Sequence, residues 1–143
     1  MPEPSSNHIL YPLFAMFALV VVVFLRMAKI RFGAVRSGEM NPAFYKTYQG
    51  DDEPEYMRVV TRHFINLFEM PVMFYVVVIA AYVTRESGTW MTALAWAYVA
   101  SRYFHSYVHL TSNDVLTRFR VYLGSAVILT LLWISLFLRL VSA

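Results

Sequence analysis

Three segments of the chain carry polar residues at helical spacing, and these residues could bind or activate a polar ligand. They are Arg62, Asn66 and Glu69 in the first segment, Arg102, His105 and His109 in the second, and Arg118 and Tyr122 in the third. Neighbouring residues within each segment lie three or four positions apart, so they share one face of a helix. Ionisable groups inside apolar helices are costly and usually face the bundle interior. The pattern therefore predicts one polar site formed by three helices.

The residue types favour an anionic ligand over a metal ion. His105 and His109 have the spacing of metal ligands, with Glu69 as a third partner, but the nearby arginines repel a cation. We therefore predict no metal. Arginine binds carboxylates in a bidentate manner, and its charge can also stabilise a thiolate. Lowering the pKa of a thiol by two pH units from its usual value of about 8.5 requires about 2.7 kcal/mol. Periodicity alone does not identify the ligand.

Such a site needs apolar helices to hold it, and the composition supplies them. Of the 143 residues, 59% are hydrophobic and 15% are charged, whereas a soluble domain has about 25% charged residues. Apolar stretches at 9–26, 64–84, 89–110 and 119–139 are each close to the roughly 20 residues that cross a bilayer. We predict an all-α integral membrane protein, a four-helix transmembrane bundle forming a single domain over residues 1–143.

The basic residues indicate the topology of this bundle. Residues 31–60 are predicted to form an irregular cytoplasmic loop, because they hold several glycines and prolines and an acidic run. Ten of the twelve Lys and Arg lie near this loop or near the junction of the third and fourth spans. The positive-inside rule then places both junctions in the cytoplasm and both termini outside it. We predict a multi-pass protein of the inner membrane, with the lipid bilayer and no nucleic acid as a partner.

Two further features of the sequence limit the function. The chain has no cysteine, so a disulfide framework and a protein thiol nucleophile are excluded, and any thiol chemistry needs a thiol from a ligand. The first apolar run is expected to be a retained helix, because Glu3 stands where a secretory signal would have basic residues.

Each polar residue also has a purely structural interpretation. Glu69 can pair with an arginine to join two helices, and Arg62 or Arg118 can extend to the membrane surface. His63 follows Arg62 but faces another side of the helix, and is predicted to lie at the membrane interface. The complete set, on three helices at one depth, favours a binding site.

Segment 62–71 resembles the signature of the MAPEG family, the membrane-associated proteins of eicosanoid and glutathione metabolism. Segment 102–109 resembles the third-helix motif of the same family, and Arg118 with Tyr122 is similar in spacing to the prostaglandin E synthase branch. The resemblance covers about residues 9–140 and is to bacterial-type members similar to microsomal glutathione transferases. It implies a homotrimer of four-helix protomers, with glutathione as a co-substrate bound between neighbouring subunits.

The resemblance also implies roles for individual residues. Arg118 matches the arginine that stabilises the thiolate, and is the implied catalytic residue. The implied glutathione-binding residues are Arg62, Asn66, Glu69, Arg102, His105, His109 and Tyr122, with either Arg26 or Lys29 from the first helix. Met70 replaces a tyrosine of the leukotriene C synthase branch, and Phe119 replaces a serine of the prostaglandin E synthase branch. Both departures argue against a specific eicosanoid activity and leave thiolate formation open.

The leading hypothesis is a glutathione-dependent membrane transferase or peroxidase, in which the thiolate attacks a lipophilic small-molecule electrophile that arrives through the lipid. One alternative is a non-enzymatic membrane scaffold or lipid-binding protein with the same fold. A small transporter is a further alternative, and the absence of broken helices in the predicted spans counts against it.

Overall fold

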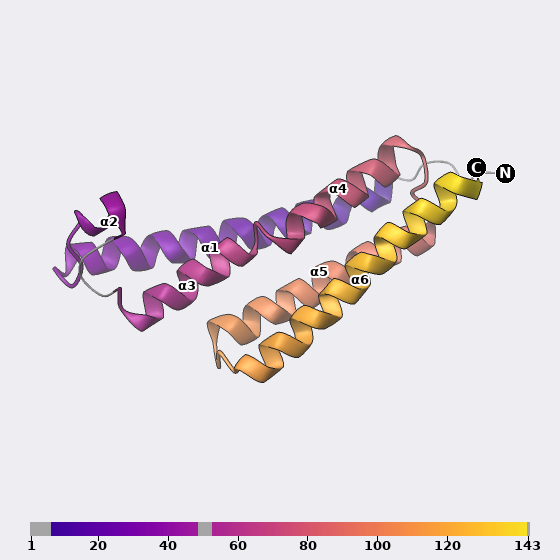
Figure 1. Ribbon diagram of the computed structural model, residues 1–143. Coiled ribbons are helices and arrows are strands. Elements are labelled where there is room, and N and C mark those ends of the chain that lie inside the picture. The colour runs from indigo at the N-terminus through magenta and orange to yellow at the C-terminus, as the bar shows by residue number, and fades with distance from the viewer. Residues whose placement is uncertain (1–6, 49–52, 143) are drawn as a thin grey trace.

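The computed structural model describes residues 7–48 and 53–142. Within these residues the chain is helical and contains no strand. The helices are η1 (Asn7–Leu10), α1 (Tyr11–Arg36), α2 (Phe44–Thr47), α3 (Glu55–Asn66), α4 (Met70–Val83), α5 (Thr89–Leu110) and α6 (Val115–Ser142). The long helices run lengthwise along one elongated bundle, and the start of α1 lies at the same end as the end of α6 (Figure 1).

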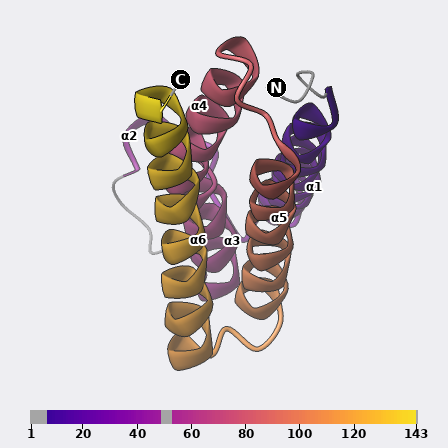
Figure 2. The same ribbon diagram turned by 90° about the vertical axis from the view of Figure 1, so that its right-hand side faces the viewer.

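Three helical stretches are long and apolar enough to cross a membrane: Asn7–Arg36, Glu55–Val83 and Val115–Ser142. The predicted span 89–110 corresponds to α5, which is not among them. This helix lies between α1 and α6 and contacts both (Figure 2). Its polar side chains Arg102, His105 and His109 are buried. These polar residues make α5 less apolar than a lipid-facing span. They are tolerated because they face protein rather than lipid.

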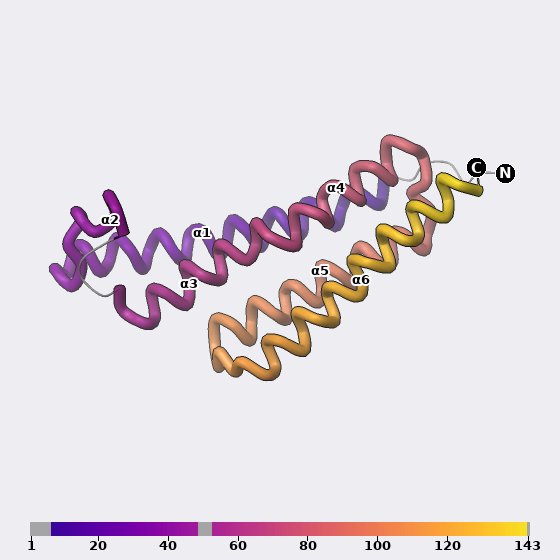
Figure 3. Tube along the Cα trace, viewed as in Figure 1, coloured from indigo at the N-terminus to yellow at the C-terminus, as the bar shows by residue number. Residues whose placement is uncertain are grey.

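The predicted span 64–84 is interrupted near its start. Helix α3 ends at Asn66 and α4 begins at Met70, with the trace turning between them (Figure 3). Pro71 explains the break, because it has no backbone N–H and its ring would clash with the Leu67 carbonyl in a continuous helix. The break lies within Glu55–Val83, which is one of the stretches long and apolar enough to cross a membrane. The argument against a transporter from unbroken helices does not hold at this position.

The predicted loop 31–60 is shorter than expected. Helix α1 continues to Arg36 and α3 begins at Glu55, with α2 between them. A small apolar cluster of Ala34, Met40, Phe44 and Met57 joins these pieces. Residues 49–52, which include part of the acidic run, lie outside the described residues. The described part of this segment is therefore packed against the end of α1.

The main core lies between the helices, and large apolar side chains cover the outside. Phe74 of α4 and Tyr98 of α5 are fully buried, and their rings stack with centroids 4.5 Å apart. In contrast, Phe14, Phe137 and Val83 are more than 60% exposed. A soluble surface rarely shows so many exposed apolar side chains on all sides, so the outer surface suits lipid or neighbouring subunits.

The start of α6 depends on Asp114. Its Oδ2 accepts a hydrogen bond of 2.8 Å from the Thr117 backbone N–H, as an N-terminal cap does. The Thr117 hydrogen bonds hold the pKa of Asp114 below its usual value. A carboxylate with a lowered folded-state pKa stabilises the fold above its unfolded pKa, and this contribution is lost as the pH falls through the folded pKa.

We expect Asp114→Ala to lower the thermal midpoint Tm at neutral pH, and this deficit to shrink as the solution is acidified through the pKa of Asp114. Thermal unfolding in detergent across a pH series measures it. Asp114→Asn is the control, because it keeps an oxygen acceptor without the titrating charge, and its Tm should exceed that of Asp114→Ala at all pH values. Equal pH profiles for wild type and Asp114→Ala would contradict this role.

Candidate functional site

The break between α3 and α4 places three of the predicted residues along one hollow. Arg62 and Asn66 come from the last turns of α3, and Glu69 lies in the break itself. Together with His109 of α5 and Arg118 of α6 they line a hollow of about 350 Å³. Five predicted residues from three different helical segments therefore meet at one place.

Arg118 is held by the turn between α5 and α6. Its Nη1 donates a hydrogen bond of 2.6 Å to Oδ1 of Asn113. Asn113 has a φ of 50°, in the left-handed region where asparagine is tolerated better than most residues. The sequence pattern did not single out Asn113, whose only signal is the usual preference of asparagine for such turns.

Two more predicted residues, Arg102 and His105, lie deeper in the bundle, and the partly buried Tyr122 lies beside them. Arg102 is 0% exposed and His105 is 2% exposed. The Arg102 guanidinium carbon lies 5.9 Å from the centre of the Tyr122 ring, and the His105 and Tyr122 ring centroids are 6.1 Å apart. None of the three guanidinium nitrogens of Arg102 has a hydrogen-bond partner among the described residues. The bundle therefore encloses a positive charge that no described carboxylate neutralises by a direct ion pair.

His63 is part of this buried group, so its prediction as an interfacial residue was wrong. It is 0% exposed, and its ring centroid lies 4.8 Å from that of His109 and 6.0 Å from that of His105. The reason is that His63 shares the apolar face of its helix with Val60 and Leu67, both of which are buried. The three- and four-residue spacing of Val60, His63 and Leu67 was visible in the sequence, and it indicates a buried position for His63.

The two basic candidates on α1 differ in position. Arg26 donates a hydrogen bond of 3.3 Å from Nη2 to the Leu110 carbonyl, and it lines a second hollow, of about 470 Å³, together with His109 and Asn113. Lys29 is exposed and lines neither hollow. The structure therefore brings Arg26, and not Lys29, near the other predicted residues.

A third hollow, of about 340 Å³, joins the other two. It shares Arg62 and Arg118 with the first hollow and Asn113 with the second, and His109 lines all three. Glu55 and Arg58 add further charges to it. A continuous polar surface therefore extends from the α3–α4 break to Arg26 of α1.

The charges of this surface suit a ligand with more than one anionic group. Arg62 and Arg118 can bind carboxylates in a bidentate manner, Glu69 can accept hydrogen bonds from an ammonium group, and Asn66 can bond an amide. Glutathione carries two carboxylates, one ammonium group, two amides and a thiol, so the residues present fit it. Among the described residues, no group of His, Asp and Glu is arranged to hold a metal ion.

The apolar helices, three of them in stretches long enough to cross a membrane, define an integral membrane protein. The chain belongs to the MAPEG family, whose model matches residues 9–138. This match confirms the family resemblance on which the site residues were named. Comparisons with curated proteins and with solved structures gave no significant match. Family membership supports a function connected broadly with glutathione or eicosanoids at a membrane.

Proposed function

We propose that the protein is a glutathione-dependent membrane transferase or peroxidase. The observation that carries the proposal is the hollow in which Arg62, Asn66, Glu69 and Arg118 converge at the break between α3 and α4. Glutathione bound there would supply a thiol group to attack a lipophilic electrophile from the bilayer.

The residues of the site have separate roles in this proposal. Arg118, fixed by Asn113, stabilises negative charge on the sulfur and so favours the thiolate. Arg62 pairs with a carboxylate of the tripeptide, and Glu69 binds its ammonium group. Arg102 is buried and has no described ion-pair partner. It adds positive potential to the hollow from the interior of the bundle, where His105 and Tyr122 lie beside it. The low-dielectric surroundings strengthen each of these interactions.

The proposed working unit is a homotrimer of single-domain protomers, each crossing the membrane four times with both termini outside the cytoplasm. Shielding of the polar side of α5 by α1 and α6 supports a fourth crossing by that helix. Arg62 and Glu69 are exposed in the single chain, so one side of the hollow is open where a second copy could close it.

Replacing Arg62 by alanine should weaken glutathione binding by roughly 10- to 100-fold, because a charge-assisted hydrogen bond contributes about 1.5–3 kcal/mol. Isothermal calorimetry on the purified protein in detergent measures the affinity. Arg120→Ala is the matched control, since Arg120 is exposed and lines none of the three hollows. Equal affinities for the two variants would contradict the role of Arg62.

The same titration of the wild-type protein separates the proposed function from the non-enzymatic alternative. Binding of glutathione, followed by conjugation of a small aromatic halide, supports the transferase. No heat at millimolar glutathione would instead favour a scaffold. Parallel titrations with other low-molecular-weight thiols would show which thiol the site accepts.

A further inference from the structure

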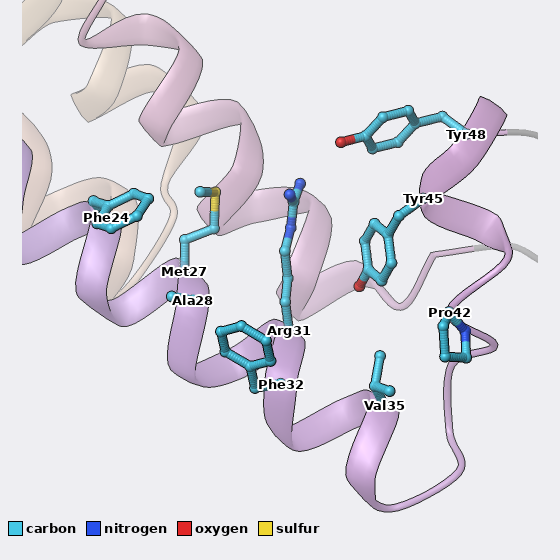
Figure 4. Close-up of a pocket in the computed structure, with 9 residues that line it drawn as sticks. All are labelled: Phe24, Met27, Ala28, Arg31, Phe32, Val35, Pro42, Tyr45 and Tyr48. Carbon is cyan, nitrogen blue, oxygen red and sulfur yellow. The ribbon is translucent and has the colours of Figure 1, made fainter.

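A fourth hollow, of about 420 Å³, lies apart from the polar site on another face of α1. One wall is a stripe of α1 that runs from Phe24 through Ala28 and Arg31 to Val35. The opposite wall is formed by Tyr45 and Tyr48 in and next to α2 (Figure 4). We call it the Arg31 groove. It shares no lining residue with the three polar hollows.

The groove is apolar along its length and charged at one place. Its residues on α1 recur every three or four positions, so they form one continuous helix face. Phe24 and Phe32 are 48% and 76% exposed, so this apolar face is open to the surroundings. Phe24 lies in the uncharged run of α1, whereas Arg31 lies beyond it, among the first basic residues after the span. The groove therefore extends from membrane depth to the membrane surface.

Arg31 has donor capacity that the described residues do not fill, although Glu53 lies one hydrogen bond away, because its Oε1 accepts from the Thr61 hydroxyl over 3.4 Å. The only described hydrogen bond of Arg31 runs from Nη2 to Oγ1 of Thr61, over 3.1 Å, and Arg31 forms no ion pair with a described carboxylate. The guanidinium carbon lies 5.2 Å from the ring centre of Tyr45 and 6.0 Å from that of Tyr48. Such cation–π contacts orient the charge without neutralising it.

Two polar atoms of the groove also lack a partner among the described residues: Nε of Arg31 and the hydroxyl of Tyr45. Burial raises the pKa of Tyr45 above its usual value, although the charge of Arg31 acts in the opposite direction. The hydroxyl therefore stays protonated and can donate. Figure 4 shows both tyrosines reaching from the α2 segment toward the Arg31 side chain. Both groups are donors and would be satisfied by oxygen acceptors of an anion after small side-chain rotations.

We propose that the Arg31 groove binds an anionic phospholipid, with the phosphate at Arg31 and an acyl chain along the apolar stripe from Arg31 back to Phe24. Basic pockets at the membrane surface are suited to anionic headgroups, and the groove volume lies in the range of about 300–1,000 Å³ typical of ligand sites. Exposed Lys29, Arg36 and Lys46 add attraction for an anionic lipid over a zwitterionic one. The site is independent of glutathione chemistry.

The test titrates the purified, delipidated protein in detergent with phosphatidylglycerol, with phosphatidylcholine and with inorganic phosphate. The Tm measures stabilisation, and native mass spectrometry counts the retained lipid. Phosphatidylglycerol should raise the Tm and stay bound, whereas phosphatidylcholine and inorganic phosphate should do neither at the same concentration. Equal effects of the two lipids, or of free phosphate, would overturn the proposal.

Substitutions inside and outside the groove test where the lipid binds. Arg31→Gln should weaken the apparent affinity for phosphatidylglycerol by about tenfold or more, whereas Arg120→Gln, at an exposed position of α6 outside the groove, should leave it unchanged. Ala28→Phe fills the apolar part of the groove, keeps Arg31, and should also reduce lipid retention. It provides the test if Arg31→Gln does not fold. Wild-type lipid binding in both Arg31→Gln and Ala28→Phe, or in the one that folds, would refute the site.

Discussion

Replacement of Arg118 by alanine is expected to lower the rate of glutathione conjugation roughly 25-fold at neutral pH. A thiol with an ordinary pKa of about 8.5 is mostly protonated at that pH. A stabilising cation that lowers the pKa by about two pH units, which requires about 2.7 kcal/mol, raises the thiolate fraction at pH 7 from about 3% to about 76%. Without Arg118 the thiol pKa should return toward its ordinary value. The deficit should therefore shrink as the assay pH rises.

The measurement is the rate of conjugation of a small aromatic halide as a function of pH, together with the ultraviolet absorbance of the thiolate. Arg118→Lys keeps a positive charge and should retain part of the rate, although lysine lacks the planar group that pairs with Asn113. Arg120→Ala on the same helix serves as the matched control. Size-exclusion chromatography checks that the variants assemble alike. Unchanged turnover in Arg118→Ala would exclude Arg118 as the thiolate-stabilising residue.

Replacement of Arg102 by methionine is expected to preserve the stability of the fold and to weaken glutathione binding. The Arg102 side chain is 0% exposed, and its three nitrogens have no hydrogen-bond partner among the described residues. Replacing buried charges by apolar side chains of similar size is often neutral or stabilises by about 1–4 kcal/mol. The Tm of Arg102→Met should therefore equal or exceed that of the wild type. Its glutathione affinity should fall by about tenfold or more, because the positive potential beneath the hollow is lost.

Thermal unfolding without ligand and calorimetry with glutathione test the two halves of this expectation separately. Arg102→Ala is the comparison, because it removes the same charge and leaves a cavity, which lowers stability. If Arg102→Met lowers the Tm as much as Arg102→Ala, then the guanidinium contributes to the stability of the fold. If it binds glutathione as the wild type does, then Arg102 has no role in the site.

The sequence predicted the membrane character and the polar residues that line one hollow, because both follow from local patterns. Apolar runs of about 20 residues indicate spans, and the three-to-four-residue spacing of Arg62, Asn66 and Glu69 indicates a shared helix face. The hollow lined by these residues with Arg118 agrees with that expectation. The depths of Arg102 and His105 relative to this hollow were not predictable, because they depend on how closely α5 packs between α1 and α6.

The errors have equally local explanations. His63 was placed at the interface because its neighbour Arg62 was given more weight than its spacing from Val60 and Leu67. The α3–α4 break followed from Pro71, whose effect on the preceding turn is a general property of proline. Both signals were present in the sequence, but only the packed structure shows that Glu69 lies in the break and that His63 contacts His109.

By itself, the sequence determined which segments are apolar, which polar residues share a helix face, and the family to which the chain belongs. The tertiary structure decided which of these faces meet: Arg26 rather than Lys29 lies near the site, Asn113 holds Arg118, and three histidines pack together. The physical reason is the distance along the chain over which each property is determined. Hydropathy and helical spacing are properties of neighbouring residues, whereas the site is formed by side chains from α1, α3, α5 and α6 that become neighbours only when the helices pack.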